Sequence, residues 1–260
     1  MAVETQAKLT TASAHSIGKV RRTNEDAMLS FEIELMRCSQ VETLGLFAIA
    51  DGMGGHVNGD QASALAVTAF SSFFFEKIMP LFLDQNSDLS SVPERLEEAV
   101  IEANQTILDH LPGSGTTFTA ALIWGERLYC AHVGDSRLLI LDEKGSIEKI
   151  TRDHSLVQMM VELGEITEDE ALSHPRRSVL LRSLGFESAL EVDLYEKQLN
   201  PGDVAVLCCD GLWSTVDLEK ISRIIHDEPV LQKAADELVN AANKAGGPDN
   251  ISCILVKRNA

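Results

Sequence analysis

A run of apolar residues that ends in Asp-Gly occurs twice in this chain, as LFAIADG at 46–52 and as VAVLCCDG at 204–211. An apolar run of this length followed at once by glycine predicts a buried strand whose last residue leaves the sheet. Asp51 and Asp210 are therefore expected to lie at the edge of a hydrophobic core. An aspartate in this position is also ordinary turn chemistry, because its side chain can bind nearby backbone groups.

Three further acidic clusters weigh against the turn alternative. They are RRTNED at 21–26, VGDSR at 133–137 and GGPDN at 246–250, and each borders a predicted strand. Buried carboxylates that converge repel one another unless a hard cation lies between them. Oxygen ligands of this kind suit Mg²⁺ or Mn²⁺, and the lack of a Cys/His cluster in the sequence argues against structural zinc. We interpret the clusters as one metal site.

The charge balance narrows the classes of partner. The 260 residues include 22 basic and 40 acidic side chains, which gives a net charge of −18. Such a surface repels phosphate backbones and anionic membranes, so neither nucleic acid nor a membrane is expected as a partner. The sequence contains no uninterrupted apolar window of membrane-spanning length. The five cysteines lack metal-ligand spacing and indicate a reducing compartment, so a cytoplasmic location is expected.

The first half of the chain predicts strands, then helices, then strands again. Early strands are expected at 16–20, 27–33 and 44–50, and two amphipathic helices at 60–77 and 93–111 should cover a sheet. Three apolar runs follow, at 116–124, 127–133 and 136–142. The turns between them are too short for parallel crossovers, so they predict an antiparallel meander with Asp135 in a turn at one end.

The second half begins with a segment, 153–185, that lacks strand periodicity and is typical of a flap. The remaining predicted elements are a strand at 204–209, helices at 217–225 and 229–244, and a strand at 251–257. Elements that come in blocks favour an α+β fold, in which layered antiparallel sheets are covered by helices. No long linker interrupts the pattern, so residues 1–260 are interpreted as a single domain with its core at about 14–258.

Taken in order, the motifs RxxNED, ADGMGGH, SGTT, VGDSR, CDGLW and GGPDNIS resemble those of the metal-dependent type 2C protein phosphatases (PPM family) in their bacterial form. The resemblance extends from about residue 16 to residue 257. It implies a four-layer αββα sandwich of two antiparallel sheets flanked by helices, with a small flap subdomain. It also implies a binuclear Mn²⁺ or Mg²⁺ centre, and hydrolysis of phosphoserine and phosphothreonine in proteins by a water that bridges the two ions.

The same resemblance implies roles for the acidic residues. Asp51 would bridge the two ions, with Asp210 and Asp249 on one of them, and Glu25 and the carbonyl of Gly52 on the other. Asp135, again with Asp210, matches the position of a third and weaker metal site. Asp26 corresponds to an acid that holds water beside the metals.

Candidates for the phosphate ligand and the general acid are less determined. Arg21 matches the family's phosphate-binding arginine, whose planar fork can hold two phosphate oxygens, and Arg22 is the competing choice. Animal members carry a histidine where this chain has Met53, which cannot donate a proton. His56 is the candidate general acid, and a metal-bound water is the alternative.

The flap motif HPRR at 174–177 offers a possible contact with substrate. His174 and Arg176 would either meet the phosphopeptide or remain solvated. Phosphorylated proteins, modified by an opposing Ser/Thr kinase, are the expected partners of a monomeric enzyme. A catalytically silent adaptor for phosphoproteins and a hydrolase of small phosphate esters are the competing hypotheses.

Overall fold

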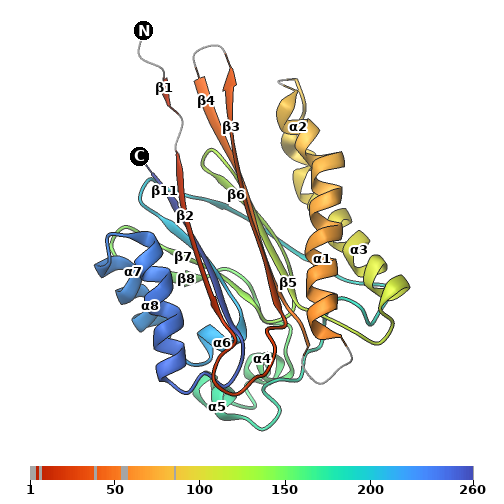
Figure 1. Ribbon diagram of the computed structural model, residues 1–260, viewed down its shortest axis with the longest axis vertical. Coiled ribbons are helices and arrows are strands. Elements are labelled where there is room, and N and C mark those ends of the chain that lie inside the picture. The colour runs from red at the N-terminus through yellow and green to blue at the C-terminus, as the bar shows by residue number, and fades with distance from the viewer. Residues whose placement is uncertain (1–3, 6–7, 38–39, 54–57, 85, 260) are drawn as a thin grey trace.

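The computed structural model describes residues 4–5, 8–37, 40–53, 58–84 and 86–259. Two β-sheets pack face to face, and helices cover the outer face of each (Figure 1). The first sheet consists of β1 (Glu4–Thr5), β3 (Asp26–Arg37), β4 (Gln40–Asp51), β5 (Phe118–Trp124), β6 (Arg127–Val133) and β9 (Asp193–Gln198). The second consists of β2 (Leu9–Ser16), β11 (Ile251–Arg258), β10 (Val204–Cys208), β7 (Arg137–Leu141) and β8 (Ile147–Lys149). All the pairings are antiparallel except that of β1 with β4.

The helices form the two outer layers. The first sheet is covered by α1 (Gly59–Phe73), a π-helical turn (Phe74–Ile78), α2 (Met79–Leu83), a 3₁₀ turn (Leu89–Ser91) and α3 (Val92–His110). The second sheet is covered by α6 (Asp210–Trp213), α7 (Leu218–Asp227) and α8 (Leu231–Lys244). Two short helices, α4 (Leu156–Glu162) and α5 (Glu168–Ser173), lie at the lower end of Figure 1. The predicted four-layer α+β sandwich is confirmed.

Burial of both faces of the strands explains why each Asp-Gly motif follows a continuous apolar run. In β10, Val206 and Cys208 face the helices on the second sheet, whereas Ala205 and Leu207 face the space between the sheets. The central strand β4 divides in the same way, with one set of side chains under α1 and α3 and Phe47 between the sheets. A strand buried on both faces reads as an unbroken apolar run. The aspartates at the ends of β4 and β10 therefore lie at the rim of the core.

The predicted meander is wrong. β5 and β6 pair in the first sheet, but β7 pairs with β10 and β8 in the second. The turn at Gly134 therefore carries the chain from one sheet to the other, and β9 occupies the edge of β6 that a meander would have used. Gly134 has a φ of +113°, and a Cβ there would lie 2.6 Å from the Thr117 Cβ. Asp135 consequently lies, as expected, in a turn at one end of β6, but this turn joins the two sheets.

The predicted strand at 16–20 is also wrong, because β2 ends at Ser16 and residues 18–20 form a turn. Gly18 has a φ of +78°, and a Cβ there would lie 2.2 Å from the Asp249 carbonyl oxygen. β2 itself was not predicted, since LTTASAHS has few large apolar residues. β9 was missed because DLYEKQ is a polar strand at the edge of its sheet.

One helical stretch meets the length and hydropathy criteria for a membrane span. Among the described residues, Gly59–Leu83 is long enough, with a mean hydropathy of 1.4, although charged and polar residues interrupt its apolar sequence. A third of that window is buried, and α1 packs against α3 and the first sheet. A core helix can pass the same test, so this stretch alone is weak evidence for a membrane span.

Candidate metal centre

Two of the predicted acids face each other where β3 begins and β4 ends. Asp26 and Asp51 are register partners in this antiparallel pair. One carboxylate oxygen from each lies within 4.8 Å of the other and of the Cys209 sulfur. One Asp26 oxygen, Oδ2, accepts a hydrogen bond of 2.6 Å from the Ser252 hydroxyl, whereas its buried Oδ1 has no hydrogen-bond partner among the described residues. A carboxylate oxygen left this way is suited to a cation or to water.

Three more acids approach Asp51 from other elements. Asp135 lies in the turn between β6 and β7, Asp210 begins α6 after Cys209, the residue that follows β10, and Asp249 precedes β11. Burial raises the pKa of Asp51 well above its ordinary value, and the charges of Asp26, Asp210, Asp135 and Asp249 raise it further. The structure therefore brings these five carboxylates into one electrostatic cluster.

Two other members of the cluster respond in the same way. Burial, followed by the charges of Asp210 and Asp153, raises the pKa of Asp135 well above its usual range. The pKa of Asp210 rises to about 7, because of burial first and then the charges of Asp249 and Asp26. Raised carboxylate pKa values of this kind show that the negative charges are not balanced by positive charge nearby, and a divalent cation would supply it.

The backbone around Asp51 and Gly52 is fixed by threonines and by close packing. The Thr117 hydroxyl accepts from the Asp51 N–H at 3.0 Å, and the Thr116 hydroxyl donates to the Asp51 carbonyl at 2.9 Å. The Gly52 N–H donates to the Glu25 carbonyl at 3.0 Å. A Cβ on Gly52 would lie 2.3 Å from the Gly59 carbonyl oxygen and 2.5 Å from that of Glu25. Only glycine fits here, and the predicted ligands Glu25 and Gly52 are held side by side.

Asn250 belongs to the GGPDNIS motif, but the sequence analysis predicted no role for it. Its amide nitrogen donates to the carbonyls of Ile17 and Thr23, and its side-chain oxygen accepts from the Glu25 N–H at 2.8 Å. The loop that carries Arg21 and Glu25 is thereby attached to the start of β11. Satisfying backbone groups of a distant loop is a function of asparagine that spacing alone cannot reveal.

Arg21 lies against the acidic cluster. Its guanidinium donates to Asp249 Oδ2 at 2.7 Å and lies 3.7 Å from Glu25 Oε2. The hydrogen bond to Asp249 is the main reason that the pKa of Arg21 is raised. Arg22, the competing candidate, is exposed. The geometry brings Arg21 to the predicted site, and its role as a phosphate ligand stays a prediction.

The loop that holds Asp135 depends on an ion pair that the sequence did not indicate. The Arg137 guanidinium binds both carboxylate oxygens of Asp153, with a shortest distance of 2.6 Å, and lies 3.6 Å from the ring centre of Trp213. The Trp213 N–H donates to the Asp135 carbonyl at 3.0 Å. Arg137 and Trp213 thus connect the start of the 153–185 segment to the backbone of a predicted ligand.

The structure describes two of the three remaining candidates, His174 and Arg176, but not His56. His56 lies outside the described residues, so its role as general acid stays a prediction. His174 follows α5, and its Nδ1 accepts from the Arg176 N–H at 3.2 Å. Within the described residues, no hydrogen bond or ion pair joins either of these flap side chains to the acidic cluster, and Arg176 is exposed.

Cys209 is close to the acids but is a poor metal ligand. Its thiol donates to the Asn250 carbonyl, with sulfur and oxygen 3.4 Å apart, and accepts from the Ser252 N–H at 3.1 Å. Burial, followed by the charges of Asp26 and Asp51, raises the pKa of the thiol well above its ordinary value. The group therefore remains protonated, and the available donors are hard oxygens that fit Mg²⁺ or Mn²⁺.

Comparison with known proteins identifies the family. A profile described as "Protein phosphatase 2C" matches residues 10–159. This chain belongs to the protein phosphatase 2C family. The serine/threonine phosphatase stp of Listeria innocua is 34% identical over 248 residues, which cover 93% of each chain.

Solved structures of this family agree with the fold. Stp1 from Staphylococcus aureus aligns with a TM-score of 0.86 at 28% identity, covering 99% of this chain and 98% of the other. The catalytic domain of PstP, solved in complex with 2 manganese ions, aligns with a TM-score of 0.78 at 32% identity, covering 97% and 99%. The predicted family membership and the assignment as a serine/threonine phosphatase are confirmed.

The raised pKa values predict how stability depends on pH without metal. Because the folded-state pKa values of Asp51, Asp135 and Asp210 lie above the unfolded ones, their contribution is present at low pH and lost as pH rises through the folded values, about 7 for Asp210. We expect the free energy of unfolding, measured by urea titration in chelator, to fall between about pH 5 and pH 8. Asp210→Asn should flatten this dependence.

Asp169→Asn, at an exposed aspartate on α5, is the matched control and should keep the wild-type pH dependence. An identical slope in wild type and Asp210→Asn would contradict the assignment of these protons to the cluster.

Proposed function

We propose that this phosphatase removes phosphate from phosphoserine and phosphothreonine residues of proteins, with two Mn²⁺ or Mg²⁺ ions as cofactors. The observation that carries the proposal is the convergence of Asp26, Asp51, Asp135, Asp210 and Asp249, whose mutual repulsion a pair of cations would relieve. The manganese ions bound by the related PstP catalytic domain support it.

The residues of the chain would divide the work of holding the ions and the substrate. Asp51 would bridge the pair, with Asp210 and Asp249 on one side and Glu25 and the Gly52 carbonyl on the other. When bound, the two cations supply a strong nucleophile from water at neutral pH and neutralise charge on the transferring phosphoryl group.

Arg21 and Asp26 have separate tasks in this proposal. The guanidinium of Arg21 is half-buried beside Asp249, where it can turn its free N–H groups toward a phosphate oxygen. Asp26, fixed by Ser252 on one oxygen, has its Oδ1 available to hold and orient a water. We propose Asp135 together with Asp210 as a third, weaker cation site, supported by the coupling of their charges.

The physiological setting is proposed from the sequence and the relatives. The substrates would be proteins phosphorylated by an opposing Ser/Thr kinase, and the enzyme would act as a monomer in the cytoplasm. The buried free thiols of Cys130, Cys208, Cys209 and Cys253 fit a reducing compartment.

Metal removal tests the proposed function. The purified protein should hydrolyse a phosphothreonine peptide in Mn²⁺, and excess chelator should lower the rate by at least about a hundredfold, because the nucleophile and the charge neutralisation are lost together. Added Mn²⁺ should restore the rate. A sugar phosphate measured in parallel should be a much poorer substrate.

Two results would contradict the proposal. Tight binding of the phosphopeptide without any turnover in Mn²⁺ would indicate an adaptor. Faster hydrolysis of the sugar phosphate than of the peptide would indicate a hydrolase of small esters.

A further inference from the structure

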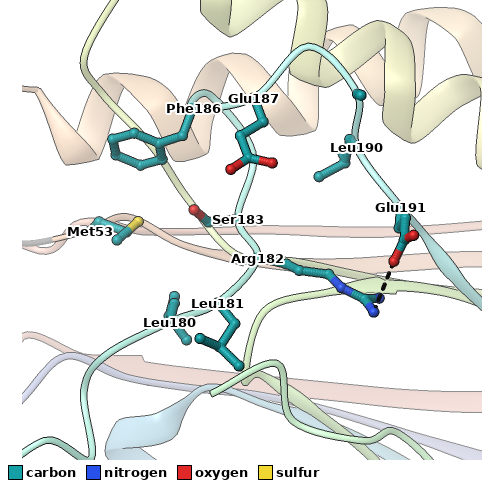
Figure 2. Close-up of a pocket in the computed structure, with 10 residues that line it drawn as sticks. Met53, Leu180, Leu181, Arg182, Ser183, Phe186, Glu187, Leu190 and Glu191 are labelled. Atoms are coloured by element: carbon teal, nitrogen blue, oxygen red, sulfur yellow. Dashed lines mark ion pairs between the residues drawn. The ribbon is translucent and has the colours of Figure 1, made fainter. Parts of the chain in front are cut away.

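A pocket opens next to the acidic cluster, and none of the roles described above uses it. Its volume is about 500 Å³, within the range of roughly 300–1,000 Å³ that is usual for ligand sites. Apolar side chains, including those of Met53, Leu180, Phe186 and Leu190, surround it, with charged groups between them (Figure 2). Leu181 and Phe186 are 49% and 41% exposed, so the pocket presents apolar surface to solvent.

The pocket is rigidly connected to the proposed metal ligands. Met53, which lines it, follows Asp51 and Gly52 directly, and the Met53 N–H donates to the Gly115 carbonyl at 3.0 Å. Thr116 forms bridges with both Gly52 and Leu184. Because three adjacent backbone segments are hydrogen-bonded side by side, the pocket wall at 180–186 is held at a fixed position relative to Asp51.

Close packing also fixes the aromatic wall. A Cβ on Gly115 would lie 2.2 Å from the ring of Phe186. The Gly185 N–H donates to the Asn104 side chain at 2.7 Å, and the Asn104 amide donates to the Glu187 carbonyl at 2.8 Å. The segment that carries Phe186 and Glu187 is therefore anchored to α3, and the pocket is formed before any substrate arrives.

The charged groups that line the pocket favour a positively charged group on a bound molecule. Arg182 is neutralised by Glu191 at 3.0 Å and by Asp193 at 2.8 Å. The Glu187 carboxylate points toward the space between Phe186 and Leu190 in Figure 2, and it has no cationic partner within the described residues. The lining thus combines apolar side chains with polar groups that carry an excess of negative charge.

We propose that this pocket binds the polypeptide next to the phosphorylated residue, and that it selects a large apolar side chain accompanied by a lysine or arginine. The proposal rests on the proposed function, since it names the class of phosphoprotein that the same site accepts. Leu181 and its apolar neighbours would contact the apolar side chain of the substrate, and Glu187 would attract the basic one. A net charge of −18 on the enzyme acts in the same direction.

Phosphopeptides with single replacements test the apolar part. A phosphothreonine peptide carries either leucine or serine at each flanking position in turn, and kcat/KM is measured in Mn²⁺. At one position the leucine peptide should be hydrolysed about tenfold faster, because a half-open apolar pocket recovers part of the transfer free energy of the side chain. The ratio between two peptides does not depend on the amount of active enzyme.

Two matched enzyme variants locate the effect. Leu181→Ser should bring the leucine-to-serine ratio close to one. Leu172→Ser changes a leucine of equal exposure, 50% against 49%, on α5 outside the pocket, and it should keep the wild-type ratio. A ratio near one at every position in wild type, or equal ratios in the two variants, would overturn the apolar subsite.

The charge is tested separately with lysine and glutamate peptides. Wild type should prefer lysine at a neighbouring position by about threefold at low salt, and Glu187→Gln should reduce this preference. An unchanged preference would overturn the role of Glu187. Efficient hydrolysis of all peptides without preference overturns the subsite alone, whereas no hydrolysis of any peptide overturns the proposed function.

Discussion

Replacing Asp51 with asparagine is expected to lower kcat/KM for a phosphothreonine peptide by about three orders of magnitude or more, because the carboxylate proposed to bridge both cations becomes neutral. The same variant should increase the free energy of unfolding of the metal-free protein at neutral pH. Asp51 is buried beside Asp26, Asp210 and Asp135, and both burial and the charges of these neighbours disfavour its ionised carboxylate. Asparagine removes this unfavourable charge and keeps the shape of the side chain.

Peptide hydrolysis in Mn²⁺ and urea unfolding in chelator measure the two effects. Asp169→Asn, on the exposed surface of α5, should change neither. Opposite signs for activity and stability distinguish a functional carboxylate from a structural one. An Asp51→Asn enzyme that retained activity, or that lost stability together with activity, would contradict the account.

Replacing Arg137 with methionine is expected to cost about 3–5 kcal/mol of unfolding free energy, since it leaves the Asp153 carboxylate buried without its main partner. The Asp153 side chain is only 4% exposed, and its remaining cation, Lys149, lies 3.6 Å away and is more exposed than Arg137. The stacking of the guanidinium on Trp213 is lost as well. Urea unfolding measures the change.

Two further variants separate the buried pair from a general effect of losing an arginine. Arg127→Met breaks an exposed pair with Glu196 at 3.5 Å and should cost no more than about 1 kcal/mol. Adding Asp153→Leu to Arg137→Met should recover part of the loss, because no buried charge then remains unpaired. Equal losses for Arg137→Met and Arg127→Met would contradict the prediction.

The sequence predicted the elements whose patterns are strong. The apolar runs of β4 and β10 and the apolar stripes of α1 and α3 were recognisable because each buries a continuous surface. The acids were found because they follow such runs or lie in family motifs. Edge elements such as β9 carry alternating polar residues and few apolar contacts, so nothing local distinguished them from a loop.

Pairings between distant segments were the main failure. The turns on either side of β6 look alike in sequence, yet one returns the chain within its sheet and the other, at Gly134, transfers it to the second sheet. The sheet in which each strand lies depends on its later partners. β9 pairs with the edge of β6, and β10 pairs with β7, and both come much later in the chain. The residues that support the site were not predicted for the same reason. Asn250 binds a loop far away in the sequence, and no sequence spacing indicates the pairing of Asp153 with Arg137.

Anomalous scattering from crystals grown in saturating Mn²⁺ tests the central claim most directly. The account predicts two strong manganese peaks beside the Asp51 carboxylate, with Asp210 and Asp249 near one of them and Glu25 near the other. A map without manganese between these carboxylates would contradict it.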